Sequence, residues 1–138
     1  MAIASKDRNH GRQWALVAMQ DFELSQLEDG VAVAAVKLPY GARVVGGGVI
    51  ISEVFNSTAT DTLTIGDGLD PDRYTATAVN ARALGFTALD VTGHKYSTTD
   101  YVDIIWASGG GTPGTGKGTL IVEYLVDGKA NEIVPDYD

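Results

Sequence analysis

The segment from Gly111 to Thr119 contains the residue types of a phosphate-binding site. Its glycines could present backbone amides to phosphate oxygens, and Lys117 could reach the terminal phosphates, as in the loop of nucleotide kinases. The generic pattern places Ser or Thr directly after the lysine, whereas Gly118 stands there in this chain, a variant that nucleotide kinases also use. The motif taken alone is therefore compatible with a P-loop-like nucleotide-binding enzyme.

The residues after this motif argue against that chemistry. A phosphate loop works when a helix begins directly after the lysine and directs its dipole at the anion. Residues 119–126 are instead β-branched, apolar and aromatic, and they lead to Asp127-Gly128, a typical hairpin turn. We also expect the nineteen residues after Thr119 to be too few for a carboxylate for magnesium and a lid. We therefore interpret the motif as a flexible loop before a strand, and the protein as not an enzyme.

Other chemistry-bearing residues have simpler structural interpretations. Asp67, Asp70 and Asp72 could offer oxygens to calcium, but their spacing does not match the EF-hand loop. We favour a turn in which aspartate side chains accept hydrogen bonds from backbone amides, and leave a metal site open. His10 and His94 have no Ser or Asp neighbours arranged as a proton relay, which indicates solvated surface positions.

The aromatic residues allow a binding module as an alternative. Trp106 is expected in the core and Trp14 at a subunit interface, because large amphipathic rings favour both places. A carbohydrate-binding β-sandwich would need tyrosines exposed on one sheet face. The candidates for that role are Tyr74, Tyr96, Tyr101 and Tyr124.

The elements that position these residues are short strands. Segments rich in Val, Ile, Thr and Tyr alternate with glycine-containing turns, and the only helix-like stretch, residues 80–84, has the length of a connector. The expected strands are residues 14–19, 30–38, 44–55, 61–65, 73–79, 101–107 and 119–126. This pattern predicts an all-β, single-domain antiparallel β-sandwich, jelly-roll-like in type. Three consecutive glycines, 46–48, predict a bulge or a close approach of backbones.

Composition limits the class of protein. Hydrophobic residues make up 44% of the 138 residues and charged residues 20%, as in an ordinary folded domain. The formal charge of -8 makes nucleic acid an unlikely partner, because phosphate backbones are repelled. The absence of cysteine excludes disulfides and thiolate metal sites. The chain has no run of signal-peptide or membrane-span type, so we expect a soluble protein without a membrane partner.

Charge is distributed unevenly along the chain. Lys6, Arg8 and Arg12 against Asp7 give residues 1–12 a net charge of +2 and leave -10 for the remainder. We expect residues 1–12 to form a flexible basic arm and residues 13–138 to form the β-sandwich domain. The three basic residues and Trp14 are the candidate contacts to neighbouring subunits.

Several phrases resemble one known family. They are Leu38-Pro39-Tyr40-Gly41-Ala42-Arg43-Val44-Val45-Gly46-Gly47-Gly48, Phe55-Asn56-Ser57, Gly66-Asp67, Asp70-Pro71-Asp72-Arg73-Tyr74, Gly93-His94-Lys95-Tyr96 and Val122-Glu123-Tyr124-Leu125-Val126-Asp127-Gly128-Lys129-Ala130-Asn131-Glu132. In this order, and with the Gly/Thr loop before the last long strand, they resemble the small head decoration, or cement, proteins of tailed bacteriophages.

The resemblance, which covers residues 31–132, carries its own expectations. It implies a jelly-roll-like sandwich that forms homo-oligomers, dimers or trimers, and needs no cofactor. It also implies binding to the outer surface of the capsid, where the protein would stabilise contacts between subunits of the major capsid protein. Such a protein would be made in the host cytoplasm and located on the exterior of the virion.

Overall fold

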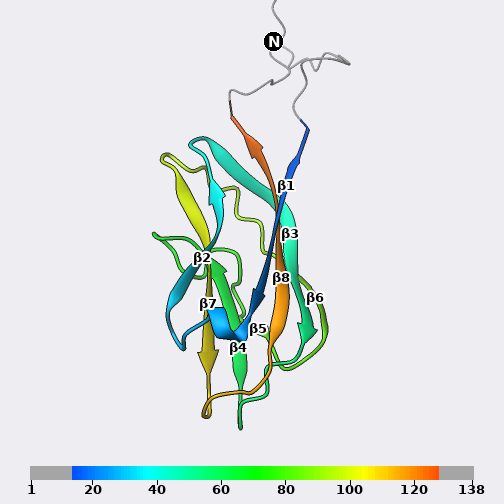
Figure 1. Cartoon of the computed structure of the whole chain (residues 1–138). Helices are drawn as coiled ribbons and strands as arrows, with labels where there is room; N and C mark the ends of the chain where they lie inside the picture. The colour runs from blue at the N-terminus through cyan, green and yellow to red at the C-terminus, as the bar shows by residue number, and fades with distance from the viewer. Residues whose placement is uncertain (1–13, 128–138) are drawn as a thin grey trace, which may run out of the picture.

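The computed structural model describes residues 14–127, which form two four-stranded antiparallel sheets packed face to face (Figure 1). The strands are β1 (Leu16–Glu23), β2 (Ala32–Leu38), β3 (Ala42–Glu53), β4 (Asp61–Gly66), β5 (Val79–Asn80), β6 (Gly85–Ala88), β7 (Asp100–Ser108) and β8 (Lys117–Val126). One short 3-10 turn, η1 (Leu24–Gln26), follows β1. In this part of the chain, no helix is long and apolar enough to cross a membrane.

The strand pairing is nested along the chain. β1 pairs with β8, β2 with β7, β3 with β6 and β4 with β5, all antiparallel, as if one long hairpin had been folded over. Pairing of β3 with β8 and of β4 with β7 then gives sheet A, in the order β1-β8-β3-β6, and sheet B, in the order β2-β7-β4-β5. This is jelly-roll topology. The expected all-β sandwich is confirmed.

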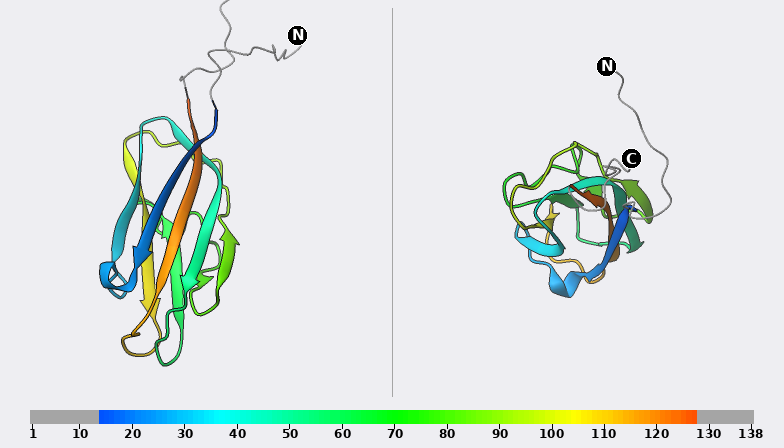
Figure 2. Two further views of the ribbon diagram at one scale, coloured as in Figure 1. Left: turned by 45° about the vertical axis from the view of Figure 1, so that its right-hand side comes forward. Right: turned by 90° about the horizontal axis from the view of Figure 1, so that it is seen from above.

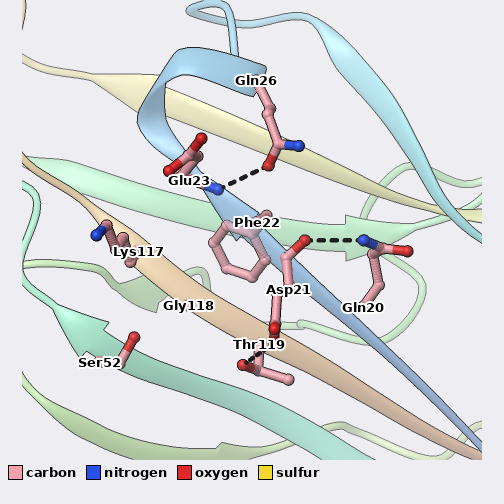
Figure 3. Close-up of a pocket in the computed structure, with 9 residues that line it drawn as sticks. All are labelled: Gln20, Asp21, Phe22, Glu23, Gln26, Ser52, Lys117, Gly118 and Thr119. Carbon is pink, nitrogen blue, oxygen red and sulfur yellow. Dashed lines mark hydrogen bonds between the residues drawn. The ribbon is translucent and has the colours of Figure 1, made fainter.

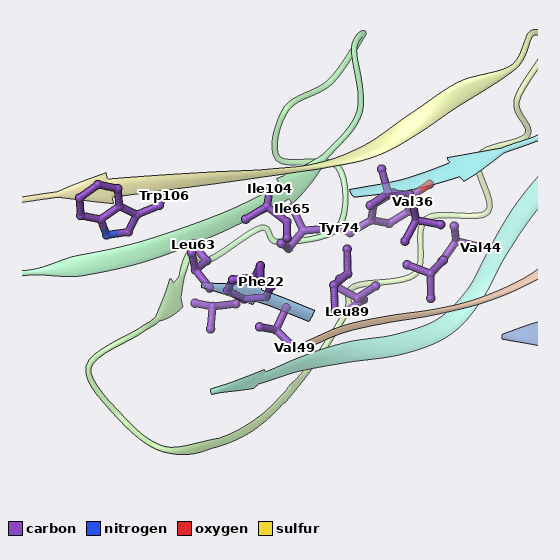
Figure 4. Packing of buried hydrophobic residues seen from close by; sticks show 14 of the residues in the cluster. Phe22, Val36, Val44, Val49, Leu63, Ile65, Tyr74, Leu89, Ile104 and Trp106 are labelled. Atoms are coloured by element: carbon purple, nitrogen blue, oxygen red, sulfur yellow. The ribbon is translucent and has the colours of Figure 1, made fainter. Parts of the chain in front are cut away.

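The core lies between the two sheets and follows from strand alternation (Figure 4). In β8, Leu120 and Val122 point inward and are fully buried, and β7 buries Val102, Ile104 and Trp106 in the same way from the opposite sheet. The structure confirms Trp106 as a core residue. Strands β7 and β8 thus give one face to the core and leave the other face outward.

The structure differs from the expected elements at one predicted strand and at one strand that was not predicted. Residues 73–79 are not a strand, since the backbone turns here so that the Tyr74 amide donates to the Ile65 carbonyl and β5 begins only at Val79. Strand β6 was not expected, because all four of its residues are exposed and show no alternation. Residues 81–84 form a turn between β5 and β6, as expected of a connector.

The three glycines of β3 accommodate a bulge and close packing, as expected. The register between β3 and β8 shifts between Val44 and Gly46. Gly47 has a φ of +117°, and a Cβ there would lie 2.1 Å from the Ile121 carbonyl oxygen. A side chain at this position would therefore separate β3 from β8.

Both ends of the described chain lie at the same end of the sandwich (Figure 2). Leu16, the first residue of β1, pairs with Tyr124, two residues before the end of β8. The antiparallel neighbours β1 and β8 therefore bring residues 14 and 127 out on one side. The expected arm with Lys6, Arg8 and Arg12, and also His10, lies outside the described residues.

Candidate interaction surface

The loop from Gly111 to Thr119 does not form a phosphate cradle. The amides of Gly114 and Thr115 donate to Asn56 Oδ1 at 2.7 and 3.1 Å, and the Gly116 amide donates to Glu53 Oε1 at 3.2 Å. Strand β8 begins at Lys117, where a P-loop would begin a helix. These amides already have acceptors within the protein, so the loop we expected to be flexible is held by hydrogen bonds and does not present them to an anion.

Lys117 lies in an environment that disfavours phosphate. Its cross-strand partners are Glu23 of β1 and Glu53 of β3. With Asp21, these residues border two open hollows of about 520 and 270 Å³ on sheet A, the larger of which is drawn in Figure 3. A phosphate bound to Lys117 would be repelled by carboxylates on both sides. The site does not support phosphoryl transfer.

Asp61 is a buried carboxylate with a structural role. Its oxygens accept hydrogen bonds from the Ser57 amide (3.0 Å), the Ser57 hydroxyl (2.8 Å) and Trp106 Nε1 (3.1 Å), and Arg82 lies 3.2 Å away. Burial by itself would raise the pKa of Asp61, but these hydrogen bonds outweigh it and lower the pKa below the ordinary value. A buried, ionised carboxylate that accepts hydrogen bonds on both oxygens thus connects the loop before β4 to β7, which is a structural role.

Asp67 has the same character at the other end of β4. Oδ1 accepts hydrogen bonds from the amides of Leu69 and Asp70 at 3.0 and 2.9 Å, and Oδ2 accepts one from Tyr96 at 2.9 Å and binds Arg73. Burial would raise the pKa of Asp67, but the bonds from Arg73 and Tyr96 lower it. The aspartate turn is therefore confirmed. Among residues 14–127, no group of three or more potential ligands is arranged to hold a metal.

The tyrosines do not form a common platform for a sugar. Tyr74 and Tyr96 are buried in the core, with their hydroxyl oxygens 2.6 Å apart. Tyr101 lies on the outside of sheet B, and Tyr124 in sheet A is half-buried. His94, expected to be solvated, is half-buried with its ring edge-on to Tyr96 at 4.9 Å. Residues from two sheets and from the core cannot stack on one ligand.

The outer face of sheet A carries an exposed apolar surface. Val49, Ile51, Leu120 and Val122 of β3 and β8 are buried, as is Phe22 of β1, so the alternate residues of these strands face outward, as does Phe86 of β6, the partner of Ile50. Four of these outward residues are unusually exposed for their size, at 58%, 64%, 42% and 60%: Val17, Met19, Val45 and Phe86. Ile50 and Ile121 are half-buried between them. We call these six residues the apolar face of sheet A.

Strand register makes the apolar face continuous. Met19 pairs with Ile121 across β1 and β8, and Ile50 pairs with Phe86 across β3 and β6. Gly48 faces Ile121 and lies under the Phe86 ring, since a Cβ there would approach the ring to 2.3 Å. Apolar side chains thus extend across all four strands. Exposed patches of this kind mark interaction sites in soluble proteins.

The outer face of sheet B differs in chemistry. Its outward positions on β4 are Thr62 and Thr64, β2 contributes Lys37, and β7 contributes Asp103 together with Tyr101 and the half-buried Ile105. Burial raises the pKa of Asp103, with further contributions from Asp100 and Asp67. Polar and charged side chains suit a solvated surface. The outer face of sheet A is therefore the more apolar of the two, and it is the candidate interaction surface.

These features define a single jelly-roll domain with one apolar outer face. No known family model matches the chain, and no curated protein sequence matches it. Solved phage capsids contain chains of the same fold. A chain in the capsid of cyanophage Pam1 is similar with a TM-score of 0.68 and 22% identity, over 91% of this chain and 94% of that one.

Two further capsid structures contain similar chains. The match in the capsid of Ralstonia phage GP4 has a TM-score of 0.67 and 19% identity, over 87% of this chain and 89% of that one. The match in the acidic stable capsid of Helicobacter pylori bacteriophage KHP30 has a TM-score of 0.64 and 16% identity, over 83% and 90%. The shared feature is the fold, across nearly the whole length of the chains.

Proposed function

We propose that this protein is a structural component of a tailed-phage virion. It binds the outer surface of the capsid and stabilises contacts between subunits of the major capsid protein, as a cement protein does. The observation that carries this proposal is the match to chains of three phage capsids over 83–91% of the length. The apolar face of sheet A supports it further, because a lattice protein needs surfaces that bind neighbours.

Stabilisation in this role arises from repetition. A weak contact repeated over a shell gains affinity when each copy is linked to several neighbours, since the second contact forms at a high effective concentration. The basic residues Lys6, Arg8 and Arg12, together with Trp14, are the proposed contacts outside the sheets. Trp14 is 77% exposed, which suits a side chain that becomes buried on assembly.

The test is a binding experiment with shells that lack this protein. Purified protein is added to such shells, and co-sedimentation and the temperature of shell disruption are measured. We expect saturable binding to the exterior and a higher disruption temperature. Removal of residues 1–12, or Trp14→Ala, should weaken binding while the domain stays folded. Lys37→Ala on the outer face of sheet B is the matched control and should bind normally.

Absence of saturable binding to the shells would refute the proposal. If the protein without residues 1–12 binds the shells fully, Lys6, Arg8 and Arg12 are not contacts, but the proposed capsid binding still stands. If the protein enters shells only while they assemble and is found inside them, the proposed location on the outer surface is wrong.

A further inference from the structure

Glu123 is a carboxylate at one end of the apolar face, in the row of residues next to the one that contains Met19 and Ile121. It lies on β8 between its cross-strand neighbours Val17 and Gly46 and is half-buried. A Cβ at Gly46 would lie 3.0 Å from Glu123 Oε2, so the carboxylate rests on the glycine. Within residues 14–127, its side chain has no hydrogen bond or ion pair. A charge partly removed from water is unfavourable unless a cation joins it.

The chemistry of a complementary partner follows from this arrangement. Apolar side chains around one unpaired carboxylate match a segment with apolar residues and at least one cation. Asp21 and Glu23, also on the outward side of β1, add negative charge beside the face. A surface of this type favours a basic, partly apolar peptide.

A second copy of the folded domain does not meet this requirement. Residues 14–127 contain 14 carboxylates and six Lys or Arg, a net charge of -8. Two such domains joined face to face would bring two Glu123 carboxylates into one interface, where like charges repel. On the outer face of sheet A, β8 carries Lys117, whose cross-strand neighbours are Glu23 and Glu53, so the described part of the chain is a poor complement to its own apolar face.

The segment that precedes the described residues has the required chemistry. Residues 1–13 combine Met1 and Ile3 with Lys6, Arg8 and Arg12, against one acidic residue, Asp7. The segment joins the domain at Trp14, two residues before β1 begins. Fully extended, 13 residues span about 43–47 Å. That length exceeds an eight-residue strand, roughly 27 Å, so the segment is long enough to cross a neighbouring sheet.

We propose that residues 1–13 of one copy bind across the apolar face of sheet A of a second copy. A cation of the segment pairs with Glu123 there, and Met1 and Ile3 cover Met19 and Phe86. The segment joins the domain at the end of the sandwich where β1 begins and β8 ends, and a neighbouring copy is the acceptor that we propose. This proposal rests on the proposed lattice role, but its test uses purified protein alone, so either can fail separately.

The test measures self-association of the full chain by sedimentation velocity between 1 and 100 µM. We expect reversible oligomers that weaken as salt rises, because the contact is partly ionic. Removal of residues 1–12, or Glu123→Lys, should weaken association about tenfold or more. Glu28→Lys is the matched control: it makes the same charge change at an exposed site outside the face and should retain association within about twofold.

A charge swap keeps the proposal testable even if one variant folds poorly. The triple variant Glu123→Lys, Lys6→Glu and Arg8→Glu should recover most of the lost association, whereas the double variant of the segment alone should not. Circular dichroism and thermal unfolding establish that each variant is folded. A monomeric full chain at 100 µM, equal association after removal of residues 1–12, or no recovery in the triple variant would each overturn the proposal.

Discussion

Asp61→Ala should destabilise the domain strongly. The variant leaves two buried donors without an acceptor, the Ser57 amide and Trp106 Nε1. The Ser57 hydroxyl is not counted, since it can donate to the Thr60 carbonyl, 3.0 Å away. At roughly 1–3 kcal/mol for each unsatisfied donor, the free energy of unfolding should fall by about 4 kcal/mol. The Arg82 side chain is 38% exposed and regains water, so its contribution is small.

Chemical denaturation with fluorescence of Trp106 and Trp14 measures this change, and thermal unfolding should show a loss of roughly 15 °C. Glu28→Ala is the control, because it removes a carboxylate from an exposed site and should change stability by less than about 0.5 kcal/mol. In a Trp106→Phe background the cost of Asp61→Ala should shrink, since one orphaned donor is gone. A cost equal to that of the control, or one unaffected by Trp106→Phe, would refute the reasoning.

The same site gives a pH dependence with a definite sign. The pKa of Asp61 is lower in the folded protein than its ordinary value of 3.8. Its stabilising contribution is therefore complete above about pH 4 and is lost as the pH falls below that value, when the folded protein must accept a proton. The free energy of unfolding, measured from pH 7 to pH 2, should fall below pH 4 more steeply in the wild type than in Asp61→Ala. Parallel profiles would contradict this assignment.

Three further predictions concern separate features. Gly47→Ala should destabilise the domain far more than Gly85→Ala, because both have positive φ but only Gly47 meets backbone atoms, and equal midpoints of unfolding would contradict this. Calorimetric titration with ATP and magnesium should give no saturable heat. The variant Lys117→Ala, at an exposed position, should leave the unfolding midpoint unchanged. Micromolar ATP binding that is lost in Lys117→Ala would instead show that the loop is a nucleotide site. Asp103→Asn should raise the unfolding midpoint at pH 7 but not near pH 3, because burial disfavours the ionised carboxylate; a gain at both values would point to another cause.

The sequence predicts those strands whose pattern is local. Residues 119–126 alternate apolar and polar positions, and the structure places them in β8. The expected strand at 73–79 is wrong because its conformation depends on distant partners. Tyr74 lies in the core against Tyr96, and the Ala76 amide donates to Asp90. No local pattern reports contacts of that kind.

The apolar face of sheet A could not be read from the sequence for a related reason. Met19, Phe86 and Ile121 lie far apart along the chain and meet only through strand register. Glu123 looks like an ordinary polar position of an alternating strand, and its isolation becomes visible only when the neighbours across β1 and β3 are known. The phosphate-loop motif shows the opposite case. Its residue pattern is local and suggests a nucleotide site, but its backbone amides donate to Glu53 and Asn56, which are distant in the sequence.

The side-by-side arrangement of β1 and β8 has a mechanical consequence. Leu16 and Val126 lie at the same end of an antiparallel pair whose hydrogen bonds run perpendicular to the strands. Force that pulls these two residues apart opens the pair one bond at a time, like a zipper, and meets little resistance. Force that pulls β1 and β8 together along their length instead shears β8 against β3, and the hydrogen bonds of that pair share the load. A domain tethered in a shell by both ends on one side would thus yield easily to splitting but resist stretching.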